Sequence, residues 1–258
     1  MDTGDGGLFL DGTVDHCPAG LVPLSDAGSP VLLLKPGAVE LVEIPSVAWD
    51  PGEGVKIING SLDTDGRLTL TWDYRVTGNQ GRQWRNAMTG RGSRLDDYIR
   101  DGLMPEGLAM RGGKPEVRGM DDWRGPLEIS LAAESDRPLH GDERSVFLPR
   151  VLTGSALDFD PRLVCDRPVD LRMGLRRRES WSIELPAGMV LAGPDSLSLV
   201  EQGVAWSSRV WQEGRVLRLE RALTFDDMTL LADQADELEK RLRKATRLDD
   251  GYLELVWK

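Results

Sequence analysis

Hydrophobic and polar residues alternate with a period of two along much of the chain, which is the pattern of half-buried β-strands. Residues 55–61 and 67–76 are two such runs, and the turn sequence Asp63-Thr64-Asp65-Gly66 separates them. Asp-Gly between two β-rich runs predicts a hairpin. In the second run one side of the strand would carry Leu68, Leu70, Trp72, Tyr74 and Val76. We expect this side to face a hydrophobic core rather than to bind carbohydrate.

The same reasoning predicts further strands before and after this hairpin. They cover residues 31–34, 39–44, 127–133, 145–148, 176–184, 196–200, 203–211, 216–223 and 252–257. Turn residues rich in proline, glycine and aspartate separate most of these runs. The chain therefore reads as a mainly β protein with sandwich-like antiparallel units.

Two segments show helical periodicity instead. Ser93 can cap a short helix that ends near Leu103, before Pro105. Asp227 can cap a longer helix over residues 228–246, with leucine and alanine on one stripe and paired charges along the surface. The glycine-, arginine- and asparagine-rich residues 78–92 predict a loop. The expected class is thus mainly β (α+β) with two helices, one of them near the C-terminus.

A change in composition suggests a division into three parts. Residues 45–54 contain two prolines and two glycines, which is typical of a linker. Residues 1–50 are then too short to bury a core of their own, and read as the tail of another core. We expect a β-rich domain with a helical excursion at 51–160 and a β-rich domain ending in a helix and a strand at 161–258.

The charge balance narrows the possible partners. The chain has 258 residues, a net charge of −11 and a pI near 4.8, which argues against electrostatic binding of nucleic acid. No apolar run is long enough for a membrane-spanning helix. The N-terminal residues lack the pattern of a signal peptide. The protein would be periplasmic or on the cell surface if an upstream segment carries a signal, and cytoplasmic otherwise.

The cysteines and histidines do not by themselves indicate a metal site, a disulfide framework or a catalytic pair. Cys17 and Cys165 have neither the spacing of a zinc site nor a disulfide framework, although a single bridge stays open for an exported chain. His16 and Cys17 are adjacent, so on an extended segment they point to opposite sides. Cys165, which could meet only His16 or His140, is expected to be a buried structural thiol. We expect no metal and no cofactor.

Three other motifs have a structural and a functional interpretation. Asp63 and Asp65 resemble the start of a calcium loop but lack the closing glutamate, which favours a hairpin turn. The basic cluster at residues 176–178 is expected to guard the edge of a sheet. The tryptophans are scattered singly over several strands, which favours positions in cores over a shared binding platform.

One motif near the N-terminus resembles a known family. Phe9-Leu10-Asp11-Gly12-Thr13, followed by a Pro-Ala-Gly-Leu-Val-Pro run at residues 18–23, is similar to the last core strand of bacterial transglutaminase-like proteins. In that family the aspartate orients the histidine of a Cys-His-Asp triad, and the resemblance gives this role to Asp11. The alternative is that Asp11 is a turn residue that binds local backbone amides; the motif context favours a position inherited from the triad, without a working triad in this chain.

The second half extends the resemblance. Pro168-Val169-Asp170 and Leu185-Pro186-Ala187-Gly188 are similar to the β-rich C-terminal domain of the same multidomain proteins, which also ends in a helix and a strand. The likeness covers essentially the whole chain, although the middle resembles the family in pattern only. The function of these accessory domains is poorly defined.

Three functional hypotheses follow. The first is a non-catalytic accessory, scaffold or partner-binding region of a transglutaminase-like protein, with the upstream core or another protein as partner; this chain alone would not be an enzyme. The second is that the chain completes a thiol hydrolase or transferase, with Asp11 as orienting residue and the cysteine and histidine in an upstream segment. The third is a β-sandwich that binds carbohydrate or a cell surface, which requires exposed aromatic side chains on one face.

Overall fold

The computed structural model describes most of the chain from residue 29 onward. The described residues are 29–44, 52–104, 108–150, 169–171, 175–193, 195–201, 203–226, 228–230, 232–249 and 251–258.

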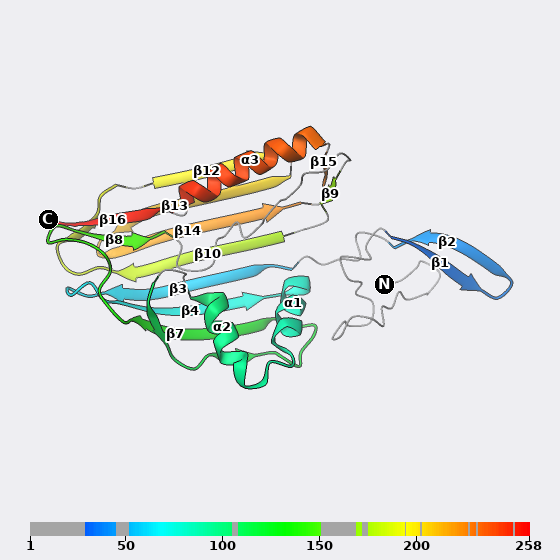
Figure 1. Ribbon diagram of the computed structural model, residues 1–258, viewed down its shortest axis with the longest axis horizontal. Coiled ribbons are helices and arrows are strands. Elements are labelled where there is room, and N and C mark those ends of the chain that lie inside the picture. Colours follow the sequence, from blue (N-terminus) through cyan, green and yellow to red (C-terminus); the bar gives the residue numbers. More distant parts are fainter. Residues whose placement is uncertain are drawn as a thin grey trace.

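A nine-stranded sheet forms the body of the protein (Figure 1). Its order is β12 (Asp195–Glu201), β13 (Val204–Glu213), β14 (Val216–Phe225), β10 (Leu175–Glu184), β3 (Gly54–Leu62), β4 (Leu68–Val76), β7 (Leu127–Ser135) and β5 (Met110–Gly112), with β6 (Glu116–Arg118) also paired to β7. All neighbours in it are antiparallel except β10 and β3, which are parallel.

The remaining elements are smaller. A three-stranded sheet has the order β11 (Met189–Leu191), β16 (Tyr252–Trp257) and β8 (Ser145–Pro149). The helices are α1 (Gly78–Met88), α2 (Leu95–Leu103), which follows the 3-10 turn η2 (Gly92–Arg94), and α3 (Ala232–Asp249). Two strand pairs stand apart from these sheets: β9 (Val169–Leu171) with β15 (Met228–Leu230), and β1 (Pro30–Lys35) with β2 (Ala38–Glu43).

One face of the large sheet is covered. The period-two pattern of β4 buries every second residue, as predicted, and Trp72 is fully buried. The same hydrophobic core includes Met88 of α1, Leu103 of α2 and Leu255 of β16. Helices and the small sheet therefore cover the same face, in front of the large sheet in Figure 1. The expected fold class, mainly β with helices including one near the C-terminus, is confirmed.

The opposite face, here called the open face, carries polar side chains. In β4 it presents Thr69, Thr71, Asp73 and Arg75, all exposed. The outward residues of β3, β10 and β14 are exposed or half-buried. No described helix or strand packs against this face.

Helix α1 corrects the loop predicted for residues 78–92. Its composition is unfavourable for a helix, but its position is held by hydrogen bonds to distant backbone. The guanidinium of Arg85 is almost fully buried and donates to the carbonyl oxygens of Gly119, Asp122 and Gly125. Because these acceptors lie more than thirty positions away, tertiary contacts override the local propensity here. The chain thus has three described helices rather than two.

The start of the last helix also differs from expectation. The helix starts at Ala232, because residues 228–230 form β15 instead of the first helical turn. The predicted boundary between residues 160 and 161 lies outside the described residues. The strands on its two sides join one sheet, since β10 pairs with β3 over eight residues. The parts 51–160 and 161–258 therefore do not form separate sheets.

The basic cluster at residues 176–178 does not guard an edge. It lies in β10, with β14 on one side and β3 on the other, in the middle of the sheet. Arg178 points to the open face, where its Nη2 lies 2.6 Å from Glu53 Oε1. The edge interpretation fails because the parallel partner β3 is more than a hundred residues away and leaves no local signal in the sequence.

The two faces of β4 predict different costs of truncation. We expect Leu70→Ala to lower the free energy of unfolding by about 2–5 kcal/mol, because it leaves a cavity in the core. Thr69→Ala, on the open face of the same strand, should change it by no more than about 0.5 kcal/mol. Chemical denaturation of both variants checks this, and equal effects would contradict the assignment of the faces.

Candidate functional site

The residues singled out from the sequence are not brought together by the described structure. Asp11, His16, Cys17 and Cys165 all lie outside the described residues. His140 is exposed, and its ring stacks on Phe147 with 6.2 Å between the centroids. Within the described residues no three metal-binding side chains cluster. The role of Asp11 stays a prediction.

The Asp63–Gly66 segment is a hairpin turn, as predicted. The amide of Gly66 donates to the carbonyl oxygen of Asp63 at 3.1 Å, and Gly66 has a positive φ of 77°. The carboxylate of Asp63 accepts a hydrogen bond from the amide of Arg67 at 2.8 Å. The carboxylate therefore helps to close the turn by accepting from an amide four residues along the chain.

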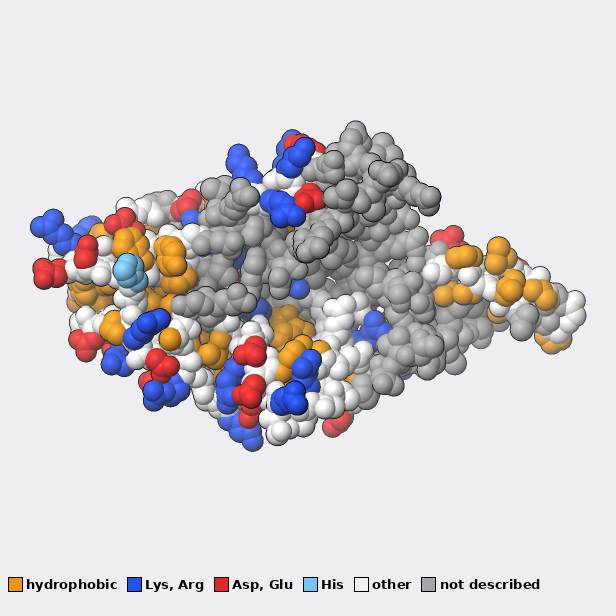
Figure 2. Space-filling view, in the orientation of Figure 1, with side chains coloured by type: hydrophobic (Ala, Val, Ile, Leu, Met, Phe, Trp, Pro, Cys, Tyr) orange, Lys and Arg blue, Asp and Glu red, His pale blue; other side chains and the backbone are white. Residues whose placement is uncertain are grey.

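The β1–β2 hairpin presents one candidate binding surface. Leu32 pairs with Leu41, and Val39 lies two residues before Leu41 on the same strand, so these three residues lie on one face of the hairpin. Leu32, Val39 and Leu41 are 66%, 66% and 70% exposed. We call these three residues the hairpin surface. Hydrophobic side chains are prominent on the projecting part at the right of Figure 2, where Figure 1 places the hairpin.

A hairpin of this kind is incomplete as a folding unit. Two strands alone are marginally stable in water and need further strands or a second layer. No third strand pairs with β1 or β2 among the described residues. Burying a leucine or valine contributes about 1.5–3 kcal/mol, so covering the hairpin surface would stabilise the hairpin substantially.

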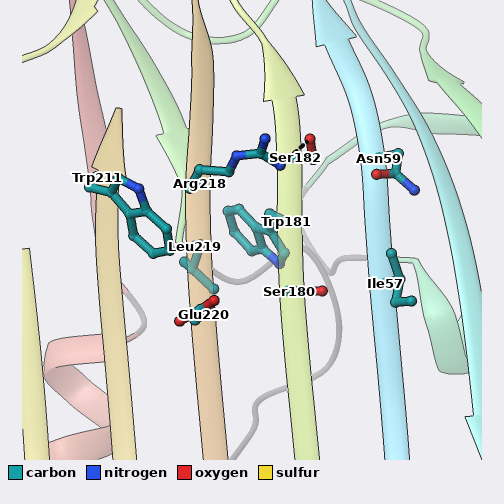
Figure 3. A pocket seen from close by; sticks show the side chains of 9 residues that line it. All are labelled: Ile57, Asn59, Ser180, Trp181, Ser182, Trp211, Arg218, Leu219 and Glu220. Atoms are coloured by element: carbon teal, nitrogen blue, oxygen red, sulfur yellow. Dashed lines mark hydrogen bonds between the residues drawn. The ribbon is translucent and has the colours of Figure 1, made fainter. Parts of the chain in front are cut away.

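A second candidate surface is a depression in the open face, shown in Figure 3. Its volume is about 360 Å³. Four adjacent strands supply the outward side chains around it: Trp211 from β13, Arg218 and Glu220 from β14, Ser180 and Ser182 from β10, and Ile57 and Asn59 from β3. Trp181 and Leu219 also border it, although their side chains are buried on the covered face. The floor is therefore largely main chain.

Strand register explains why the sheet is hollow here. One row across the strands consists of Trp211, Arg218, Ser182 and Asn59. The next row consists of Arg209, Glu220, Ser180 and Ile57. The middle strand β10 contributes only serines to these rows, between larger side chains on its neighbours. Short side chains on the central strand β10 and longer ones on its neighbours leave a shallow depression.

The cationic groups near the depression are engaged within the chain. Arg218 Nη1 donates to Ser182 Oγ at 2.8 Å, and its Nε lies 3.9 Å from Glu213 Oε2. The guanidinium of Arg209 lies 4.9 Å from the centre of the Trp211 ring, a cation–π contact. The depression is thus not a concentration of unpaired positive charge.

On the covered face, a buried ion pair links the middle strands. Arg221 Nη1 of β14 lies 3.1 Å from Glu179 Oε1 of β10, and both side chains are at least nine-tenths buried. The same carboxylate oxygen accepts a hydrogen bond from Trp181 Nε1 at 2.6 Å. Arg221 also donates to the carbonyl oxygen of Arg150, beyond the end of β8. These contacts connect the two layers and serve the fold.

Tyr74 is a buried titratable group on the covered face, and its hydroxyl is not suited to act as a catalytic base. Burial raises the pKa of its hydroxyl above the ordinary value of 10.0, and the charge of Arg177 offsets only part of this. The hydroxyl therefore stays protonated at neutral pH, as expected of a core tyrosine.

Comparison with known proteins does not assign the chain to a family. No model of a known protein family matches the chain, and no curated protein matches it significantly. No described helix is long and apolar enough to cross a membrane.

Two Arg–Glu pairs of different burial predict different stabilities. Glu179→Ala should lower the free energy of unfolding by about 3–5 kcal/mol, because it removes a carboxylate from a buried arginine. Glu128→Ala is the matched control: its partner Arg75 is 58% exposed and 3.9 Å away, so the loss should be at most about 1 kcal/mol. Urea denaturation measures both, and a small effect of Glu179→Ala would contradict a structural role for this pair.

Proposed function

We propose that this chain is a non-catalytic accessory region of a transglutaminase-like protein, and that it attaches to the catalytic core through the hairpin surface. The observation that carries the proposal is the exposure of Leu32, Val39 and Leu41 on a two-stranded sheet. A partner that covers this face would supply the second layer that the hairpin lacks.

Sequence order supports the core as the partner. The motif that resembles the last core strand, around Asp11, directly precedes the hairpin in the chain. Residues 29–44 would then extend the sheet of the core, which agrees with the interpretation of residues 1–50 as the tail of another core. Unpaired strand edges of β1 and β2 offer backbone hydrogen bonds to such a sheet.

The remainder of the chain suits a scaffold. Its described side chains that are both buried and charged, such as Arg85, Glu179 and Arg221, make contacts that hold helices and strands together. In the proposed arrangement the nine-stranded sheet presents the open face to further partners. In the alternative, enzymatic role the core would provide the nucleophile and the base, and Asp11 would orient the histidine.

The hairpin surface can be tested by substitution. We expect Leu32→Ser/Leu41→Ser to weaken binding of the protein to a separately produced transglutaminase-like core on the order of 100-fold, because two leucines lose their burial. Val200→Ser is the control, since Val200 is 81% exposed on β12 of the large sheet and should leave the affinity unchanged. Isothermal titration calorimetry gives both affinities.

Two results would contradict the attachment. One is equal affinity of the core for the wild-type protein and the double hairpin variant. The other is a homodimer of the wild-type protein that the double variant converts to a monomer, as measured by light scattering. That outcome would make a second copy of the chain the partner of the hairpin.

The role of Asp11 has its own test. In a protein that includes the catalytic core, Asp11→Asn should lower turnover on the order of 10³–10⁴-fold, because the histidine loses the group that orients it. Asp15→Asn, four residues along, should have little effect. A fully active Asp11→Asn protein would show that Asp11 is only a turn residue.

A further inference from the structure

We propose that the depression in the open face binds a neutral oligosaccharide, with one sugar ring against Trp211. This site lies on the large sheet, so it is separate from the hairpin surface and does not depend on the attachment proposed above. Three features of the described residues support this site: an outward aromatic ring, free polar side chains and the absence of a free cationic cluster.

The aromatic ring lies on the outward side of β13. Val204, Trp206 and Val210 of this strand are buried on the covered face. Trp211 has the opposite parity and lies at the open face, half-buried. In Figure 3 its ring leans from β13 toward Arg218 on β14. Indole faces bind the apolar C–H faces of sugar rings as they bind other flat groups, with an apolar body and a polar rim.

On the opposite side of the depression Ile57 provides a second apolar surface. Its side chain is 43% exposed, although most isoleucines in the described sheet are buried. Ile57 and Trp211 lie on β3 and β13, three strand spacings apart, or roughly 14 Å at about 4.8 Å each. A short oligosaccharide running across the strands would contact both.

Between these walls lie polar groups with unused hydrogen-bonding capacity. The side chains of Asn59, Ser180 and Glu220 make no hydrogen bond or ion pair among the described contacts, and they come from three neighbouring strands. An amide, a hydroxyl and a carboxylate together can donate to and accept from the hydroxyl groups of a sugar. Their spread over the floor matches a ligand with hydroxyls along its length.

The charges favour a neutral ligand over an anionic one. Arg218 is held by Ser182 and Glu213, and Arg209 lies against the Trp211 ring. The lining residues carry one arginine, Arg218, and one glutamate, Glu220, so their formal charges cancel and provide no excess positive charge for phosphate or sulfate. The volume of about 360 Å³ is at the low end for small-molecule sites, which suits one or two sugar rings.

Titration calorimetry with cellotriose, maltotriose and chitotriose tests the proposal on the full chain. We expect at least one of these neutral trisaccharides to bind with a dissociation constant below about 1 mM. Trp211→Ala should weaken it at least about tenfold, and Trp211→Phe should retain most of the affinity because the flat ring remains. Asn59→Ala should weaken it less, through the loss of one polar contact.

Thr69→Ala, on the same face but outside the lining residues, is the matched control and should bind as the wild type does. Leu32→Ser/Leu41→Ser should also bind normally, which separates this site from the hairpin surface. The thermal unfolding midpoint of each variant confirms that it is folded. The proposal is overturned if no trisaccharide binds at about 10 mM, if Trp211→Ala leaves the affinity unchanged, or if a sulfated trisaccharide binds more tightly than the neutral one.

Discussion

The pairing of β10 with β3 is the constraint on which the rest of the structure depends. It is the parallel contact in an otherwise antiparallel sheet, and it joins the strands before residue 150 to those after residue 175. Because β10 also pairs with β14, the buried Arg221–Glu179 contact and the row from Trp211 to Asn59 exist only once this strand is in place. The core lies on one face of this sheet and the depression on the other, and both depend on the same strand order.

The sheet separates stability from recognition. Its covered face buries Trp72, Trp181 and the side chains of helices and the small sheet, which supplies the hydrophobic free energy of folding. Its open face contributes little to that core and can carry side chains chosen for binding. The hairpin differs from both, since its apolar face has no second layer in the described structure. The apolar hairpin surface therefore needs a covering partner more than the polar open face does.

The sequence predicts local features of this fold better than distant ones. The alternation from Leu68 to Val76 and the turn at Asp63 depend on neighbouring residues, and both were predicted correctly. Helix α1 was missed because its stability comes from Arg85 and carbonyl groups far along the chain. The central position of Arg178 was missed for the same reason, since strand order depends on contacts between residues distant in sequence.

One feature of the depression has a signal in the sequence. Trp211 follows Val210 directly, so the period of two places it opposite to Val204 and Trp206, and this parity distinguishes it from the core tryptophans. The neighbouring side chains that complete the depression could not be identified in this way. Ser182 and Asn59 come together only through the register of β10 on β3.

We propose that a catalytic core covers the hairpin surface, and the DNA that precedes the codon for Met1 tests whether such a core accompanies this chain. We predict that the same reading frame, or the gene next to it, encodes a cysteine and a histidine in the helix-then-strand context of a transglutaminase-like core. If neither does, Asp11 has no triad to complete and the hairpin must bind a different protein, which would contradict the account.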